Sequence, residues 1–223
     1  NQGYELSIES DNLTGAFSWT TAFNIAFNRN KVLELGGEEY KEMAEGDGHL
    51  KTGSVRRLIV GEPIGVFYGY RFDGIFQNEE ECKQQTSSAS PIGVGLRRYK
   101  DLNGDGKVDA ANDREILGDA NPKFFGGLTN TFAYKGFELN VFLQYSYGNK
   151  ILNYNAMELE NPTGGQNAYA DMVNRWTPEN PSNIYPKATT NRALLVSDRF
   201  IEDGSYLKLK TLSLSYSFPK INL

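Results

Sequence analysis

Apolar and polar residues alternate along five stretches of the chain. Between Phe17 and Phe27 the odd positions are large and mostly apolar, while the even positions are small or polar. A period of two residues predicts a β-strand with one apolar face. The alternation is clearest at 137–147, where Phe142 alone breaks it. We predict five strands, near residues 2–9, 17–28, 124–134, 137–147 and 205–218.

The connections between these strands are unequal. Two short turns, near 10–16 and at 135–136, alternate with two long excursions, 29–121 and 148–204. In an up-and-down antiparallel sheet this order places the tight turns at one edge and the long loops at the other, as in outer-membrane barrels. Strands of about ten residues also suit a tilted crossing of the hydrocarbon layer. Aromatic residues near strand ends fit interfacial girdles: Phe17, Trp19, Tyr145, Tyr147, Tyr216 and Phe218.

The predicted fold class is therefore all-β, with antiparallel up-and-down strands of a transmembrane β-barrel, present as a partial barrel with two long extracellular loops. A soluble β-sandwich with an aromatic core is the alternative, because its solvated face would show the same small and polar residues. Within the first excursion, residues 61–77 are rich in Gly and aromatics and predict a short hairpin of their own. Residues 78–98 are polar and predict a solvated connector.

Composition excludes several classes of function. The net charge of -5 and the pI near 5.1 argue against a nucleic-acid partner, which needs a basic surface. The single cysteine, Cys82, cannot form an internal disulfide or a paired-cysteine metal site. No run of about 18 apolar residues is present, and we expect neither a spanning helix nor a signal peptide in this sequence.

Catalytic motifs are not evident in the sequence. It contains no GxSxG, Walker, dinucleotide-binding or HExxH pattern. Acidic pairs such as Glu38 with Glu39 suit glycoside hydrolysis only at a defined separation, which sequence does not give. The one histidine, His49, lies in a polar stretch without Cys or a second His. We predict that the chain is not an enzyme; a glycan-processing enzyme is the weakest alternative.

Residues 101–116, DLNGDGKVDAANDREI, resemble a calcium-binding loop. Residues of this stretch stand at the spacing of positions 1, 3, 5, 6, 7 and 9 of such a loop, with Gly106 at position 6 and Lys107 at position 7. Position 12, however, is Asn112, and an Asp follows one step later. The alternative is a turn whose Asp and Asn side chains bind their own backbone and need no metal. The candidate calcium site comprises Asp101, Asn103, Asp105, Lys107, Asp109 and Asp113.

The second excursion holds a group of aromatic residues and an arginine. Aromatic faces and a guanidinium fork are chemistry that suits a sugar or a peptide. The alternative is ordinary packing within the loop. The candidate ligand-binding residues are Tyr154, Tyr169, Arg175, Trp176 and Tyr185.

Five segments in this order resemble the SusC/RagA family of TonB-dependent outer-membrane transporters, in the C-terminal part of the barrel. They lie at 1–35, 60–81, 101–153, 174–181 and 197–219, and include VGEPIGVFYGYRFDGIFQNEEE and SDRFIEDGSYLKLKTLSLSYSFP. The resemblance implies a barrel of about 22 strands with a plug domain, a TonB-contacting segment and a signal peptide. None of these upstream parts is in this sequence, so we expect an internal piece of a longer protein. In the family an Asp usually stands at position 12 of the Asp-rich loop, which puts full calcium coordination here in doubt.

The resemblance also implies a function and partners. It implies part of an importer in the Gram-negative outer membrane, for oligosaccharides or, alternatively, peptides. The expected partners are a SusD-like surface lipoprotein over extracellular loops, TonB acting through the plug, and membrane lipid, with no nucleic acid. The alternative from the residues is a soluble β-sandwich carbohydrate-binding module with a structural calcium loop.

Overall fold

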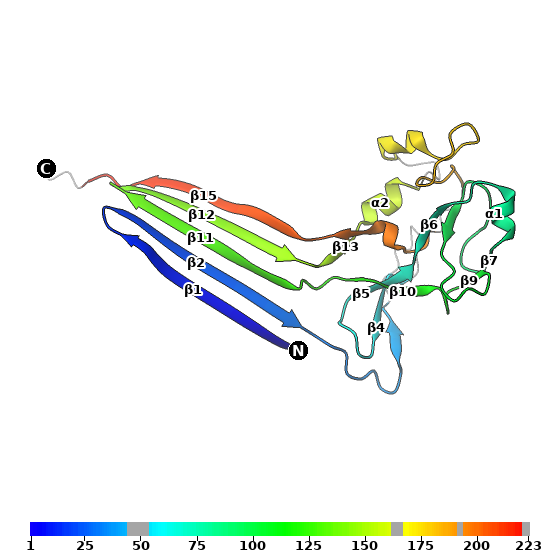
Figure 1. Ribbon diagram of the computed structural model, residues 1–223, viewed down its shortest axis with the longest axis horizontal. Coiled ribbons are helices and arrows are strands. Elements are labelled where there is room, and N and C mark those ends of the chain that lie inside the picture. The colour runs from blue at the N-terminus through cyan, green and yellow to red at the C-terminus, as the bar shows by residue number, and fades with distance from the viewer. Residues whose placement is uncertain (44–53, 162–166, 191–193, 220–223) are drawn as a thin grey trace. The chain divides into compact units, whose positions relative to one another are not determined.

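The computed structural model describes residues 1–43, 54–161, 167–190 and 194–219 (Figure 1). The chain divides into two compact units. Unit 1 consists of Asn1–Lys31, Asn121–Lys150 and Asp203–Leu223, and unit 2 of Val32–Ala120 and Ile151–Glu202. Within the described residues, no helix has both the length and the apolar character needed to cross a membrane.

Unit 1 is one antiparallel sheet. Its strands are β1 (Gln2–Thr14), β2 (Phe17–Arg29), β11 (Phe124–Tyr134), β12 (Phe137–Tyr147) and β15 (Tyr206–Tyr216). Figure 1 shows them side by side in the order β1-β2-β11-β12-β15, which is also their order in the chain. The prediction of an all-β fold with antiparallel up-and-down strands is therefore confirmed. Within the described residues the sheet is open.

β1 is longer than the predicted strand. The alternation stops near residue 9, but pairing with β2 continues to Thr14, and the register shifts between Asp11 and Leu13. A bulge of this kind inserts one extra residue and moves the following side chains to the opposite parity. The turn that joins the two strands is consequently shorter than predicted.

The tight turn between β11 and β12 lies at the predicted position. Lys135 and Gly136 both have positive φ angles, +46° and +87°. Two consecutive positive φ angles are typical of a type I′ turn, whose twist matches that of the flanking strands.

One face of this sheet carries exposed apolar side chains. The exposed fractions of Tyr4 and Leu214 are 80% and 69%, and Leu6, Ile8 and Leu212 are exposed too. Aromatic rings also pack along the sheet, as where the Trp19 and Phe132 centroids lie 5.8 Å apart. A β-sandwich would enclose these side chains between two sheets. Their exposure contradicts the β-sandwich alternative.

The break in alternation at Phe142 has a packing explanation. Its ring covers Gly127 on the neighbouring strand, where an added Cβ would lie 2.7 Å from Phe142 Cε2. Tyr145 similarly covers Gly126, and its hydroxyl donates to the carbonyl of Asn24 at 2.8 Å. Large rings thus fill the space that the two glycines leave in β11.

Unit 2 contains short strands and helices formed by the two excursions. A four-stranded sheet has the order β10-β5-β4-β3, and three pairs are β6-β8, β7-β9 and β13-β14. The strands are β3 (Tyr40–Glu42), β4 (Arg56–Ile59), β5 (Val66–Tyr70), β6 (Phe72–Ile75), β7 (Thr86–Ser87), β8 (Arg97–Tyr99), β9 (Lys107–Val108), β10 (Arg114–Asp119), β13 (Lys150–Leu152) and β14 (Ile201–Asp203). The helices are α1 (Glu79–Lys83), α2 (Tyr154–Leu159), and the 3-10 turns η1 (Ala170–Asn174) and η2 (Asp198–Phe200).

The excursions therefore fold around a core of their own. Side chains from both excursions meet in it, among them Phe67, Leu117, Met157, Leu194 and Phe200. Burial of this apolar surface is what holds segments so distant in the chain together.

The predicted hairpin at 61–77 is wrong. β5 pairs with β10 and β4, whereas β6 pairs with β8, so the two halves of the segment belong to different sheets. Only Arg71 separates β5 from β6, too little to reverse the chain.

The predicted connector at 78–98 contains the short helix α1. The Asn78 side chain caps the start of this helix by accepting the Glu81 N–H at 2.8 Å.

Candidate functional site

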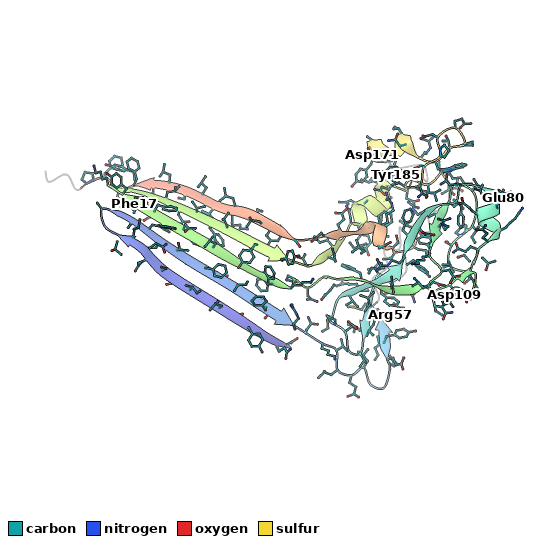
Figure 2. All side chains as sticks on the ribbon, in the orientation of Figure 1. Phe17, Arg57, Glu80, Asp109, Asp171 and Tyr185 are labelled. Atoms are coloured by element: carbon teal, nitrogen blue, oxygen red, sulfur yellow. The ribbon has the colours of Figure 1, made fainter. Side chains whose placement is uncertain are left out.

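The Asp-rich loop is organised by its own side chains. The Asp101 carboxylate accepts the N–H groups of Gly104 and Gly106, both at 2.7 Å. Asp105 accepts the N–H of Lys107 at 2.8 Å. Asp109, labelled in Figure 2, accepts two further backbone N–H groups and pairs with the Lys107 ammonium at 3.2 Å. This is the geometry of successive turns capped by Asp and Asn.

Asp113 has a different role from the other acidic residues of the loop. It is fully buried, with 0% of its surface exposed. One carboxylate oxygen accepts the Leu102 N–H at 2.8 Å and the other accepts the Asp109 N–H at 2.7 Å. Asp113 therefore clasps both ends of the loop, a role that its spacing in the sequence did not reveal.

The geometry leaves the calcium hypothesis as a prediction. Within the described residues no group of three or more His, Cys, Asp or Glu side chains is placed to hold a metal ion. A carboxylate has about four lone-pair positions, so accepting N–H bonds does not by itself prevent an oxygen from binding a cation. The N–H of Asn112 and the Lys107 ammonium hold the pKa of Asp109 below its ordinary value, which keeps it ionised. His49 lies outside the described residues.

Two of the predicted ligand-binding residues contact each other. The Trp176 N–H donates to the Tyr185 carbonyl at 3.0 Å, and the indole Nε1 donates to Gln77 Oε1 at 3.1 Å. The indole also packs on Gly95, where an added Cβ would lie 2.6 Å from Trp176 Cε3. Tyr185, labelled in Figure 2, has its ring 5.3 Å from the Arg199 guanidinium. Part of this group therefore serves the packing of unit 2.

The other three predicted residues lie at the ends of two elements. Tyr154 begins α2, Tyr169 precedes η1 and Arg175 follows it. The side chains of Tyr154 and Tyr169 are exposed. The described contacts bring Trp176 and Tyr185 together, and Tyr154 and Tyr169 present exposed aromatic rings on the second excursion.

A polar cavity of about 330 Å³ lies beside the Asp-rich loop. Its wall includes Asp73, Glu81, Arg98, Lys100 and Asp101. Arg98 forms ion pairs with Asp73 at 3.0 Å and with Glu81 at 3.6 Å. Charged donors and acceptors that face one opening can bind a ligand with several hydroxyl groups. No local pattern in the sequence marks this site, because the residues of its wall come from separate stretches of the chain.

Two arginine clusters, one around the buried Arg57 and one around the partly exposed Arg71, also have no local signature in the sequence. The Arg57 guanidinium lies between the rings of Tyr40 and Tyr68, with centroid distances of 4.0 and 3.9 Å, and pairs with Glu42. Arg57 is labelled in Figure 2. Burial tends to raise the pKa of Glu42, but the hydrogen bond from Arg57 and the charge of Arg114 outweigh it and lower the pKa. The cluster joins β3, β4 and β5.

The second cluster joins the two excursions. Arg71 pairs with Glu115 and, at 3.2 Å, with Asp198. Asp198 also accepts the N–H of Phe72 at 2.8 Å. The hydrogen bond to Glu115 is the main reason that the pKa of Arg71 is raised. These contacts fix η2 against β10 and the start of β6.

Comparisons with known proteins identify the family. A search against protein-family models finds no match, so the family is identified from individual relatives. The chain is 38% identical over 99% of its length to "TonB-dependent receptor P3" of Formosa agariphila, and 33% identical over 98% to "TonB-dependent receptor P26" of the same organism. It is also 24% identical over 99% to "TonB-dependent receptor SusC" of Bacteroides thetaiotaomicron. The chain belongs to the TonB-dependent receptors of the SusC/RagA type.

The chain spans only about a fifth of these receptors. It covers 22% of the length of P3 and of P26, and 21% of SusC. Two solved structures agree in fold: the RagAB peptide transporter, with a TM-score of 0.72 and 21% identity, and the RagAB peptide importer in its "closed-closed" state, with a TM-score of 0.71 and 20% identity. In both cases 97% of this chain and 23% of the other chain are covered.

The fold of this receptor segment accordingly resembles part of the RagA barrel. The exposed apolar face of unit 1 has the alternation that strands of a membrane barrel need, since every second side chain meets lipid. The open sheet of five strands is consistent with a part of a larger barrel.

Proposed function

We propose that the chain forms part of the wall and the extracellular portion of a TonB-dependent importer in the outer membrane of a Gram-negative bacterium. The observation that carries this proposal is the 38% identity to a TonB-dependent receptor along 99% of the chain. The exposed apolar face of unit 1 supports contact with lipid. The long excursions leave the sheet at the end opposite to its tight turns, which fits an extracellular position.

For the substrate we propose an oligosaccharide. The polar cavity offers carboxylates and cations for hydroxyl groups, and the exposed rings of Tyr154 and Tyr169 offer faces for sugar rings. Peptide import is the second candidate, and the two solved relatives described as a peptide transporter and a peptide importer favour it. The proposed partners are a SusD-like surface lipoprotein and TonB, with no nucleic acid.

Growth of the parent bacterium tests the substrate. The gene for the complete receptor is deleted, and growth is measured on single oligosaccharides and on peptides as carbon sources. We expect growth to be lost on one class of oligosaccharide and restored by the wild-type gene. Loss confined to peptides would replace the first candidate by the second, and unchanged growth on both would contradict an import role.

A substitution in the polar cavity tests the site separately. Arg98→Gln removes a guanidinium from the cavity, whereas Lys83→Gln removes an exposed charge from α1 as the matched control. We expect the first variant to be inserted normally but to bind the oligosaccharide about tenfold more weakly, as for a charged hydrogen bond. Equal affinity of both variants would remove the cavity from the proposal.

We keep calcium binding by the Asp-rich loop as a separate proposal. A cation bound by Asp101, Asp105 and Asp109 would stiffen the segment that leads towards β11. Calorimetry of the complete receptor is the test, with Asp105→Asn as the comparison. Absence of any calcium affinity at about millimolar concentration or tighter would leave the loop held by its hydrogen bonds alone.

A further inference from the structure

A second cavity in unit 2, of about 150 Å³, has a mainly apolar wall and one cationic group. Pro91, Leu96, Pro186 and Leu195 supply apolar surface, and Arg97 and Asn161 supply polar atoms. An apolar cavity of this volume is large enough to hold benzene. The cavity therefore has room for a body of about six non-hydrogen atoms.

Arg97 is the cationic side chain in the wall of this cavity. Its Nη2 donates to the carbonyl oxygen of Glu160 at 3.0 Å, and the guanidinium lies 6.0 Å from the ring centroid of Phe200. Its Nε is buried and has no hydrogen-bond partner within the described part of the chain. Burial is also the main reason that the pKa of Arg97 is lowered from its ordinary value.

Arg97 differs from Arg57, Arg71 and Arg199, because it has no carboxylate partner among the described ion pairs. The Glu160 carboxylate is engaged by Arg199, at 2.5 Å. Arg57 and Arg71 likewise pair with carboxylates, and their counter-ions lie within the same clusters. Arg97, by contrast, meets only the backbone oxygen of Glu160 among its described hydrogen bonds. A partly buried cation without a carboxylate partner attracts an anion.

We propose that this cavity binds a small monocarboxylate with an apolar body. The carboxylate is bound by the Arg97 guanidinium, which lines the cavity and pairs with no carboxylate among the described ion pairs. The apolar body packs against Pro91, Leu96 and Leu195. A free short acid and the apolar C-terminal residue of a peptide share this chemistry. The site is separate from the polar cavity, and the proposal holds whichever substrate the receptor imports.

Calorimetry of the complete receptor in detergent tests the proposal with benzoate as the probe and benzamide as its neutral counterpart. We expect benzoate to bind, and benzamide to bind about tenfold more weakly or worse, because it lacks the charge. Arg97→Gln should weaken benzoate by a similar factor, while Lys83→Gln, at an exposed position of α1, should leave it unchanged. N-acetyl-leucine and its amide, compared in the same way, distinguish a peptide end from a free acid.

A second variant keeps the test valid if Arg97→Gln does not fold. Ala89 lines the cavity, and Ala89→Leu fills it while leaving the arginine in place. Benzoate binding should then be lost with the thermal unfolding temperature preserved. The proposal is overturned if the wild-type receptor does not bind benzoate at about 10 mM, if benzamide binds as tightly, or if both cavity variants retain wild-type affinity.

Discussion

Replacing Asp113 by Asn should open the Asp-rich loop without changing the shape of the side chain. In the wild-type chain, the two carboxylate oxygens accept the N–H groups of Leu102 and Asp109 at 2.8 and 2.7 Å. An Asn side chain has one oxygen that accepts and one NH₂ group that only donates. In Asp113→Asn, one of the two backbone N–H groups therefore faces another donor in a fully buried position.

The structure sets the size of the effect. A hydrogen bond to a charged group contributes about 1.5–3 kcal/mol, and a buried donor left without a partner costs about 1–3 kcal/mol. Because Asn keeps one of the two bonds in a weaker, neutral form, we expect the free energy of loop opening to fall by about 2–3 kcal/mol. At tenfold per 1.4 kcal/mol, the open state becomes about 30- to 150-fold more populated.

Hydrogen exchange with mass spectrometry measures this opening directly. In the complete receptor in detergent, peptides that cover residues 100–114 should exchange the Leu102 and Asp109 amides faster by about that factor. Asn112→Ala is the control, because Asn112 is exposed and adjacent to Asp113. Peptides from β12 should be unchanged in both variants.

Two results would contradict the proposal that Asp113 holds the loop closed. One is wild-type exchange of the Leu102 and Asp109 amides in Asp113→Asn. The other is an equal acceleration in Asn112→Ala, which would mean that any change in this turn has the same effect. Repeating the wild-type measurement with calcium separates the two explanations of the loop: a loop held by its carboxylates alone exchanges at the same rate with and without the ion.

Three further predictions concern other elements. Gly136→Ala should destabilise the receptor by about 1–2 kcal/mol in urea unfolding from lipid vesicles, because its φ is +87°, whereas Lys135→Gly should be neutral or stabilising. Phe142→Ala should cost about 1–2 kcal/mol in the same assay, since it uncovers an adjacent glycine. The lowered pKa of Glu42 means that its stabilisation of Arg57 is present above the ordinary Glu pKa and is lost as the pH falls through the lowered value. Amide protection of β3 and β4, corrected for intrinsic exchange, should therefore persist above the ordinary Glu pKa and fall only as the pH is lowered below it, and Glu42→Gln should lack this acid transition.

The strands of unit 1 could be predicted because all their residues follow the same requirement, that side chains alternate between an apolar face and a polar face. A strand with one apolar face repeats every two residues, and β11 and β12 cover the predicted ranges 124–134 and 137–147. β1 shows where the two-residue period fails to give the full length of a strand. Its bulge between Asp11 and Leu13 shifts the parity of the pattern, so the last residues of the strand read as a turn.

Unit 2 could not be predicted in the same way. Its strands are two to six residues long, too short for a period to emerge. Its decisive contacts join residues far apart in the chain, such as Arg71 with Asp198. The sequence pointed to the Asp-rich loop, but neither the role of Asp113 as a clasp nor the position of Arg97 in a cavity has a local signature.

The two units differ in the surroundings that stabilise them, and with the proposed function this makes ligand binding separable from membrane insertion. Unit 1 leaves Leu207, Leu212 and Leu214 of β15 exposed, so the stability of its sheet depends on lipid against that face. Unit 2 encloses Met157 and Phe200 in a core of its own, which needs no lipid. Substitutions in the cavities of unit 2 should therefore change ligand affinity while the amount of receptor in the membrane stays constant. Charged substitutions on the apolar face of β15 should lower the amount inserted, without changing the affinity of the receptors that remain.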